Sequence, residues 1–209
     1  MIRVRGVAEM RPGWVDAVSV RRIVAVALVV VAGVIAVRED PSERRVEVVV
    51  AARELPPGHV VEAGDLRVVD RAADTLPNGV AREAGAVVGA TLAGAVTEGE
   101  ILTDLRVVGT RLAGVAAGDG DGRIVPIRLA DKAVAEVLRA GDRVDVVAGE
   151  ESGGRGARLL ASDAAVVLVS GVGSAGRDQE RVVLVALDAR RAAVVAAASL
   201  RSALTVVFH

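Results

Sequence analysis

The sequence predicts a single N-terminal transmembrane helix, then a mainly β region, then a small α+β unit. Three observations lead to this fold class. Fifteen consecutive residues near the N-terminus carry no polar side chain, two valine-rich stretches in the middle share a glycine turn, and the last third alternates strand and helix patterns. Of the 209 residues, 52% are hydrophobic, so the chain is able to bury a packed core.

The hydrophobic residues are mostly valine and alanine, with one Phe, one Trp and no Tyr. Valine fits a pleated surface and favours strands. A net charge of −1 creates no positive field for nucleic acid, and the shortage of aromatic rings removes stacking platforms for single strands. Because of this charge and this shortage of aromatic rings, we expect no nucleic-acid partner. The absence of cysteine excludes disulfides and thiolate chemistry.

The apolar run IVAVALVVVAGVIAV extends from Ile23 to Val37. Arginines stand before it at positions 3, 5, 11, 21 and 22, and acidic residues follow it at 39 and 40. By the positive-inside rule, residues 1–22 form a cytoplasmic tail, 23–37 form the membrane anchor, and the remainder lies outside the cytoplasm. As a helix the run spans about 22 Å, less than a hydrocarbon core of about 30 Å, so flanking arginine side chains would extend it towards the headgroups.

Two other interpretations of this run stay open. It fits the apolar region of a cleaved signal peptide, because Val34-Ile35-Ala36 resembles a cleavage site, and the remainder would then be secreted. It also fits a buried core helix. The anchor and the signal peptide both place the remainder outside the cytoplasm.

After a predicted linker at 38–45, the sequence contains an internal repeat. The stretch ARELPPGHVVEAGDLRVV starts at Ala52, and AGAVTEGEILTDLRVV starts at Ala93. With a two-residue gap between them, Gly58 aligns with Gly99, and the two DLRVV segments align with each other. Each copy is expected to run from a valine-rich strand through a glycine turn into a short DLRVV strand.

The chemistry-bearing residues of this repeat are two aspartates, Asp65 and Asp104, which begin the DLRVV segments. We expect both to accept hydrogen bonds within a turn, and Gly58 and Gly99 to take positive φ. Neither aspartate has a base, a nucleophile or a metal-ligand cluster near it in the sequence, so the predicted role is structural rather than catalytic.

Residues 46–109 resemble a SAF domain, a small β-clip module. The resemblance rests on VVVAARELPPGHVVEAGDLRVV and VVGATLAGAVTEGEILTDLRVV. Such modules occur in sialic acid synthases, antifreeze-like proteins, flagellar P-ring chaperones and pilus assembly proteins. The module alone does not choose among these functions.

Residues 110–122 lack periodicity and end in glycines and aspartates, which predicts a second linker. From 123 to 209 the pattern reads strand, helix, strand, strand, strand, helix, strand, a small α+β unit. Strands are expected at 123–129, 143–148, 159–170, 181–187 and 203–208.

Three residues are expected to cap the helices of this unit. Asp131 precedes the first helix, whose left-handed C-cap is expected at Gly141, and Asp188 precedes the second helix. The inner faces are predicted to carry Val134, Val137 and Leu138 in the first helix, and Val194, Val195 and Ala198 in the second.

The segments RIVPIRLADKAVAEVLRAGDRVDVVA and ERVVLVALDARRAAVVAAASLRSALTVVF resemble the C-terminal region of Flp pilus assembly proteins of the CpaB/RcpC type. The resemblance implies a non-enzymatic, membrane-anchored, extracytoplasmic assembly factor for a type IVb (Tad) pilus, with proteins of the pilus and secretion machinery as partners. It carries over no catalytic residue, no cofactor and no metal. The alternative is a cell-wall glycan-binding protein, or a secreted chaperone-like one. An enzyme with a SAF appendage lacks a visible nucleophile–base set.

Three further motifs do not predict a site. Gly171–Gly176 fits G-x-G-x-x-G, but a strand-like segment follows where a dinucleotide site needs a helix, so we expect a hairpin loop. His59 and His209 have no spaced partner ligands. Asp119 and Asp121 lack the remaining ligands of a calcium loop.

Overall fold

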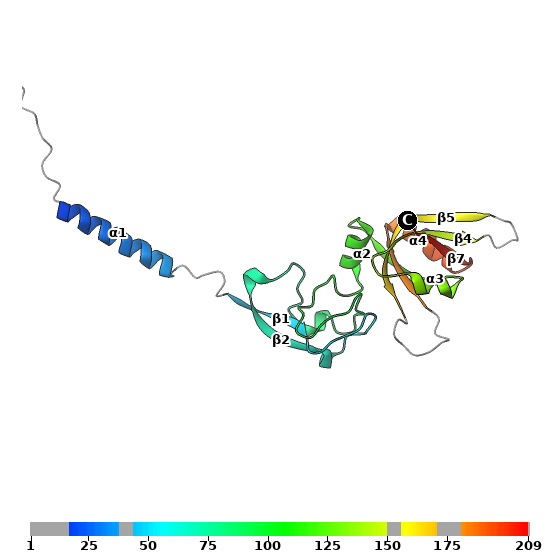
Figure 1. Cartoon of the computed structure of the whole chain (residues 1–209), viewed down its shortest axis with the longest axis horizontal. Helices are drawn as coiled ribbons and strands as arrows, with labels where there is room; N and C mark the ends of the chain where they lie inside the picture. The colour runs from blue at the N-terminus through cyan, green and yellow to red at the C-terminus, as the bar shows by residue number, and fades with distance from the viewer. Residues whose placement is uncertain (1–16, 38–43, 150–155, 171–180, 209) are drawn as a thin grey trace, which may run out of the picture. The chain divides into compact units, whose positions relative to one another are not determined.

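The computed structural model describes residues 17–37, 44–149, 156–170 and 181–208 (Figure 1). The chain divides into two units, Met1–Arg44 and Arg45–His209. Several predicted features lie wholly or largely outside the described residues: most of the cytoplasmic tail, most of the first linker, the G-x-G-x-x-G segment and His209.

The first unit contains helix α1, Ala17–Val37, which begins six residues before the apolar run. Every side chain described on it, from Val20 to Ile35, is exposed. Within the described part of the chain, no helix has both the length and the apolar character required to cross a membrane. The segment predicted as an anchor is thus helical, and its insertion into a membrane stays a prediction.

The second unit begins with a two-stranded antiparallel sheet of β1, Arg45–Ala51, and β2, Leu66–Ala72. One-turn 3-10 helices lie at Ala63–Asp65, Ala73–Thr75 and Ala84–Ala86. Loops close the other edge of β1, where the backbone N–H of Val49 donates to the Ala81 carbonyl at 2.9 Å. The core of this region is aliphatic throughout: Val49, Ala51, Leu55, Val61, Ala81, Val87, Leu92, Val96 and Leu102.

The linker predicted at 110–122 is wrong for its first part, because Thr110–Ala117 form helix α2. Gly118 ends the helix in the left-handed conformation, at φ 69°, and its N–H donates to the carbonyls of Gly114 and Val115. The glycines that suggested a linker have a packing role instead. The carbonyl of Ala113 occupies the space that a Cβ on Gly122 would need, so a side chain there is excluded.

The rest of the unit is built on a five-stranded antiparallel sheet in the order β3-β6-β5-β4-β7. Its strands are β3 Arg123–Ile127, β4 Arg143–Gly149, β5 Ala157–Val169, β6 Val183–Leu187 and β7 Leu204–Phe208. Helix α3, Lys132–Val137, lies between β3 and β4, and helix α4, Ala189–Ser199, between β6 and β7. The element order matches the sequence prediction, and Pro126 lies on an edge strand as expected.

Different elements cover the two faces of this sheet. On one face Ala135 of α3, the adjoining Leu138, and Ala192, Val195 and Ala198 of α4 complete a core. On the other face, side chains of α2 pack with Ala93 and Val108 against β5 and β6. The first part of the unit therefore packs on the sheet, and Arg45–His209 form one compact unit.

Two details of the helices differ from the prediction. Helix α3 ends at Val137, with Leu138 extended, so Gly141 is not its C-cap. Val137 is 64% exposed, whereas Ala135 and Leu138 are buried, so Ala135 takes the inner position that was expected for Val137. In α4, Val194 is 43% exposed and Ala192 takes the expected inner position beside Val195 and Ala198. Small alanines face the sheet because they allow close approach.

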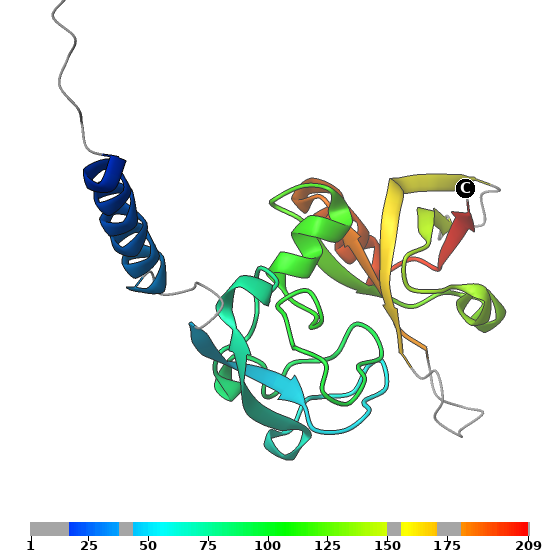
Figure 2. The same cartoon turned by 60° about the vertical axis from the view of Figure 1, so that its left-hand side comes forward.

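Strand β5 turns a sharp corner midway, which Figure 2 shows. The pairing with β4 shifts between Val144–Ala164 and Val146–Ala161, which marks a β-bulge. Asp163, at the corner, has a positive φ of 57°, and its N–H donates to a carboxylate oxygen of Asp145 at 3.0 Å. An aspartate tolerates this conformation better than a β-branched residue would.

Candidate functional site: a twofold turn repeat and the pocket at Asp104

The internal repeat consists of two related segments, residues 49–66 and 90–107, each with one glycine turn. The two segments are hydrogen-bonded to each other. The counterpart of each residue stands 41 positions further along the chain, as 58 to 99 and 55 to 96. Leu55 and Val96 exchange both backbone hydrogen bonds, each at 2.9 Å. Around them, Gly58 N–H donates to the Leu92 carbonyl and Gly99 N–H to the Ala51 carbonyl, both at 2.8 Å. The two copies thus lie antiparallel about a local twofold axis.

The glycine prediction is confirmed at both turns. Gly58 has φ 78° and Gly99 has φ 79°. An L-residue in this conformation brings its Cβ too close to the backbone. Because the turns reverse the chain only in this conformation, glycine at both positions follows from the backbone alone.

The alignment of the two DLRVV segments is wrong by two residues. Leu66 pairs with Ala51, and the counterpart pair is Val107 with Leu92, so the structural repeat has no gap. Asp104 and Leu105 lie in a turn rather than at the start of a strand. Strand β2 forms because β1 is its partner along seven residues. The counterpart of β1, residues 86–92, begins at the end of the 3-10 helix Ala84–Ala86 and continues as a turn to residue 89, so the second copy has no such partner.

Asp65 forms the most connected polar cluster of the first copy. Its carboxylate accepts hydrogen bonds from Arg53 Nε at 2.9 Å, from His59 Nε2 at 2.6 Å and from the backbone N–H of Glu62 at 2.9 Å. Arg53 also forms an ion pair with it at 2.6 Å. The side chain is 3% exposed. The role expected for Asp65, as an acceptor within a turn, agrees with the bond from Glu62.

These contacts also fix the charge of Asp65. The Glu62 N–H, His59 and Arg53 together lower the pKa of Asp65 from 3.8 to about 2, although burial opposes them. The sequence indicated no partner ligand for His59, but its side chain is only 23% exposed and contacts Asp65. The only sequence signal was a histidine six residues before an aspartate, across a turn.

The second copy carries a corresponding pair with the acidic and basic side chains exchanged. Glu100 and Arg106, the counterparts of His59 and Asp65, form an ion pair at 2.6 Å. Arg106 is 46% exposed, whereas Asp65 is 3% exposed. The repeat therefore conserves the position of an ionic contact but not its polarity or its burial.

Asp104 lies at the edge of a pocket of about 460 Å³. Its backbone N–H donates to the Gly79 carbonyl at 2.9 Å, and its carboxylate occupies the space of a Cβ on Gly79, which has φ 77°. One carboxylate oxygen, Oδ1, is buried without a hydrogen-bond partner among the described residues. Arg111 Nε is 3.9 Å from the other oxygen. Asp104 thus packs against the loop at Gly79, and the expected role as a hydrogen-bond acceptor within a turn is not found for its carboxylate among the described residues.

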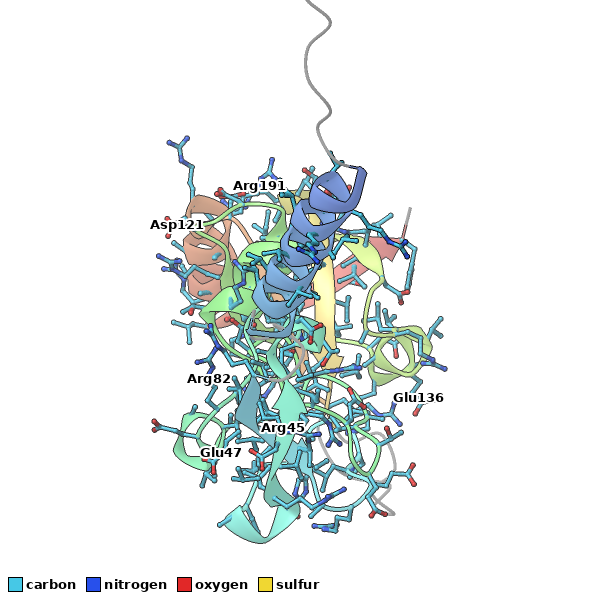
Figure 3. All side chains as sticks on the ribbon, turned by 90° about the vertical axis from the view of Figure 1, so that its left-hand side faces the viewer. Arg45, Glu47, Arg82, Asp121, Glu136 and Arg191 are labelled. Atoms are coloured by element: carbon cyan, nitrogen blue, oxygen red, sulfur yellow. The ribbon has the colours of Figure 1, made fainter. Side chains whose placement is uncertain are left out.

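The pocket is lined by charged and aliphatic residues. Its lining residues are Gly79, Val80, Ala81, Arg82, Glu83, Ala86, Val87, Asp104 and Val107. None of these is a serine, threonine, cysteine or histidine, and the ionisable side chains of the lining are Arg82, Glu83 and Asp104. The side chain of Arg82 reaches the surface of the unit (Figure 3). In the described ranges, no group of three His, Cys, Asp or Glu side chains has the arrangement of a metal site.

The remaining expected caps lie apart from the pocket. Asp131 accepts from the Ala133 N–H at 2.8 Å, and Asp188 accepts from the Arg191 N–H at 2.9 Å, as predicted for N-caps. Gly141 has φ 100° in a turn after α3, and its N–H donates to the Val166 carbonyl at 2.8 Å. Its positive φ was expected for a different reason, the end of a helix.

Comparison with known proteins identifies one part of the chain. Residues 46–108 match the SAF domain family. No curated protein and no solved structure matches the chain. The chain thus carries a SAF domain at 46–108, where the sequence predicted one.

Proposed function

We propose that this chain is a membrane-anchored, extracytoplasmic assembly factor for a Flp-type (type IVb/Tad) pilus, and that it acts without catalysis. The observation that carries the proposal is the order of its parts. An apolar helix precedes a SAF domain, which packs on a five-stranded α+β unit. The sequence of that last unit resembles the C-terminal region of CpaB/RcpC-type proteins.

The character of α1 supports the anchor. Its side chains from Val20 to Ile35 are exposed, and an exposed helix that is apolar on all sides needs a non-aqueous surrounding or a partner. The apolar run 23–37 within this helix spans about 22 Å, less than a hydrocarbon core of about 30 Å. Arg21 and Arg22 lie on the helix before the apolar run, where their side chains would reach cytoplasmic headgroups.

The non-catalytic part of the proposal rests on the chemistry of the polar groups. Asp65 is held by three donors from this chain, and its lowered pKa makes it a poor proton donor or acceptor near neutral pH. Asp104 is engaged with the loop at Gly79. An assembly factor requires only contact surfaces, and both aspartates serve to shape the backbone that presents them.

A gene deletion tests this function. We expect the deletion to abolish surface pili while pilin is still made and processed, because the chain supplies neither peptidase nor ATPase chemistry. The full-length chain should restore pili, and a variant lacking residues 23–37 should not. Normal piliation in the deletion strain would reject the pilus role.

Fractionation tests the anchor separately. The full-length chain should sediment with membranes, and protease added to intact cells should spare its C-terminal part. A soluble product beginning near Val37 would instead support cleavage of a signal peptide.

A second candidate function is binding to cell-wall glycan through the pocket at Asp104. The observation that favours it is a pocket rimmed by Arg82, Glu83 and Asp104, whose charged groups are able to bond sugar hydroxyls. The lack of aromatic residues in the lining counts against it. Co-sedimentation of the wild type and of Arg82→Ala with isolated cell wall separates the two functions. If the wall retains the wild type but not the variant, the result favours glycan binding.

A further inference from the structure

Within the described residues, the strands β2, β3 and β7 each leave an outer edge of a sheet open, and residues 157–163 of β5 have no partner strand on the side of β6. These edges are protected unequally, and the stretch of β5 carries the exposed charge of Arg158. Strand β2 carries exposed charges at Arg67, Asp70 and Arg71. Strand β3 carries Pro126, which has no N–H to offer. Strand β7 ends in Val206, Val207 and Phe208, without a charge or a proline. Charges and prolines on edges prevent strand pairing between molecules, so β7 is the edge on which pairing remains possible.

The hydrogen bonds around β7 show which backbone groups are open. The Ala203 carbonyl accepts from Gly149 N–H at 3.0 Å, on the side of β4, and the Leu204 carbonyl accepts from Ala130 N–H at 2.8 Å, on the outer side. Because these directions alternate along a strand, the N–H and C=O groups of Val206 and Phe208 also point outward. The segment around Leu129 covers the edge only at Leu204. Two N–H and two C=O groups therefore remain available for a neighbouring strand.

The exposed side chains lie at the same place. Leu204 and Val206 point into the core, at 1% and 8% exposure, whereas Val207 points to the opposite face and is 53% exposed. Phe208, the single phenylalanine of the chain, is 46% exposed at the end of the strand. The open part of the edge is thus both unpaired and apolar.

We propose that two copies of this chain pair edge to edge through β7, antiparallel, with Val207 of each copy opposite the other. In this register Val206 of each copy exchanges both backbone bonds with Phe208 of the second copy. All four open N–H groups of the two strands then find acceptors, and the pairing ends before it meets the segment at Leu129. Each Phe208 ring lies beside Val206 of the other copy, an aromatic and β-branched pair of the kind that stabilises antiparallel strands.

A second copy fits this edge because the open stretch is complementary to itself in length and in side chains. The two five-stranded sheets would join into one continuous sheet. The ladder is short, so the association is weak and reversible, and a covalent trap is the suitable assay. This inference is independent of the pilus proposal, because it concerns only the chain's contact with itself.

The chain has no cysteine, so a single Val207→Cys substitution gives one thiol per molecule. In the proposed register residue 207 is a non-hydrogen-bonded pair with Cα atoms about 4.5 Å apart, within the range of about 4.4–6.8 Å that a disulfide spans. Mild oxidation of the full chain in detergent should convert the 21.3 kDa monomer to a covalent dimer.

Thr205→Cys is the matched control, because Thr205 is exposed on the same strand and the same face. The two copies of residue 205 would be four positions apart along the strand, about 13 Å, too far for a disulfide. Adding Phe208→Pro to Val207→Cys removes the outward N–H of Phe208 while leaving the bonds to β4, and cross-linking should then be lost. Equal cross-linking of the two single variants, no cross-linking of Val207→Cys, or an unaffected Phe208→Pro variant would each overturn the proposal.

Discussion

The first half of the SAF domain, residues 49–66, and the second half, residues 90–107, make the same backbone hydrogen bonds with different side chains. Around the first turn, His59 and Arg53 hold the buried carboxylate of Asp65. Around the second turn, Glu100 and Arg106 form an exposed pair. The comparison separates what the backbone requires, a glycine at each turn, from what each copy adds for its own surroundings.

The two halves also continue differently. After the first half the chain enters β2, which completes the small sheet with β1. After the second half it enters α2, which packs on the five-stranded sheet. The second half thus connects the SAF domain to the rest of the unit. The first half leads into a strand that pairs with β1 within the SAF domain. Stability of the SAF domain should accordingly depend more on the polar cluster of the first half.

The largest expected effect is that of Asp65→Asn. The amide keeps the shape of the carboxylate but offers a donor to a site that holds only donors, so at least one of Arg53, His59 and the Glu62 N–H loses its acceptor in a buried position. The melting temperature, followed by circular dichroism on the full chain in detergent, should fall clearly. Arg106→Gln, at the counterpart position, is the control and should fall much less. Equal losses would mean that burial of Asp65 has no energetic weight.

Acid should weaken the first half by the same contacts. The pKa of Asp65 is lowered from 3.8 to about 2 in the folded chain. A lowered pKa stabilises the fold above the unfolded value, and this contribution is lost as the pH falls from about 4 towards about 2. Melting temperatures measured across this window should drop for the wild type. The drop should be smaller in Asp65→Asn, which has no carboxylate to protonate, and an identical pH profile would contradict the assignment.

Substitution of the two turn glycines should lower the stability of the fold by similar amounts in the two halves. Gly58→Ala and Gly99→Ala each place a Cβ on a residue with φ near 78°, which costs about 1–2 kcal/mol. Neither Cβ would meet a close contact, since the nearest atoms are 3.9 Å away at Gly58 and 3.6 Å at Gly99. The two losses should therefore be similar in denaturant unfolding. Gly64→Ala, with no positive φ and nothing near, is the control and should change little.

Much of the fold could be predicted from the sequence because it depends on local patterns. The strands of the α+β unit, the N-caps at Asp131 and Asp188 and the two turn glycines all follow from periodicity or from the conformation of one residue. The SAF domain was predicted from its repeated phrases, and residues 46–108 match that family.

What the sequence did not predict depends on contacts between distant segments. Helix α2 resembled a linker because Gly122 is glycine for packing against Ala113, a contact that is visible only in three dimensions. The identical DLRVV segments suggested an alignment of the two copies that is wrong by two residues. The correct alignment depends on which residues pair across each turn. The pocket at Asp104 likewise forms only where the loop at Gly79 packs against Asp104, and the sequence does not show that contact.

The smallest expected effect is that of the exposed pair in the second half. Arg106 is 46% exposed and Glu100 is 22% exposed, so water competes with their contact. A double-mutant cycle with Glu100→Gln and Arg106→Gln should give a coupling below about 1 kcal/mol. High salt should reduce it further, because the screening length shrinks from about 8 Å near physiological ionic strength to about 3 Å at 1 M. A coupling as large as the loss caused by Asp65→Asn would mean that the two halves are equivalent in energy as well as in backbone, and that exchanging the charges preserved their contribution.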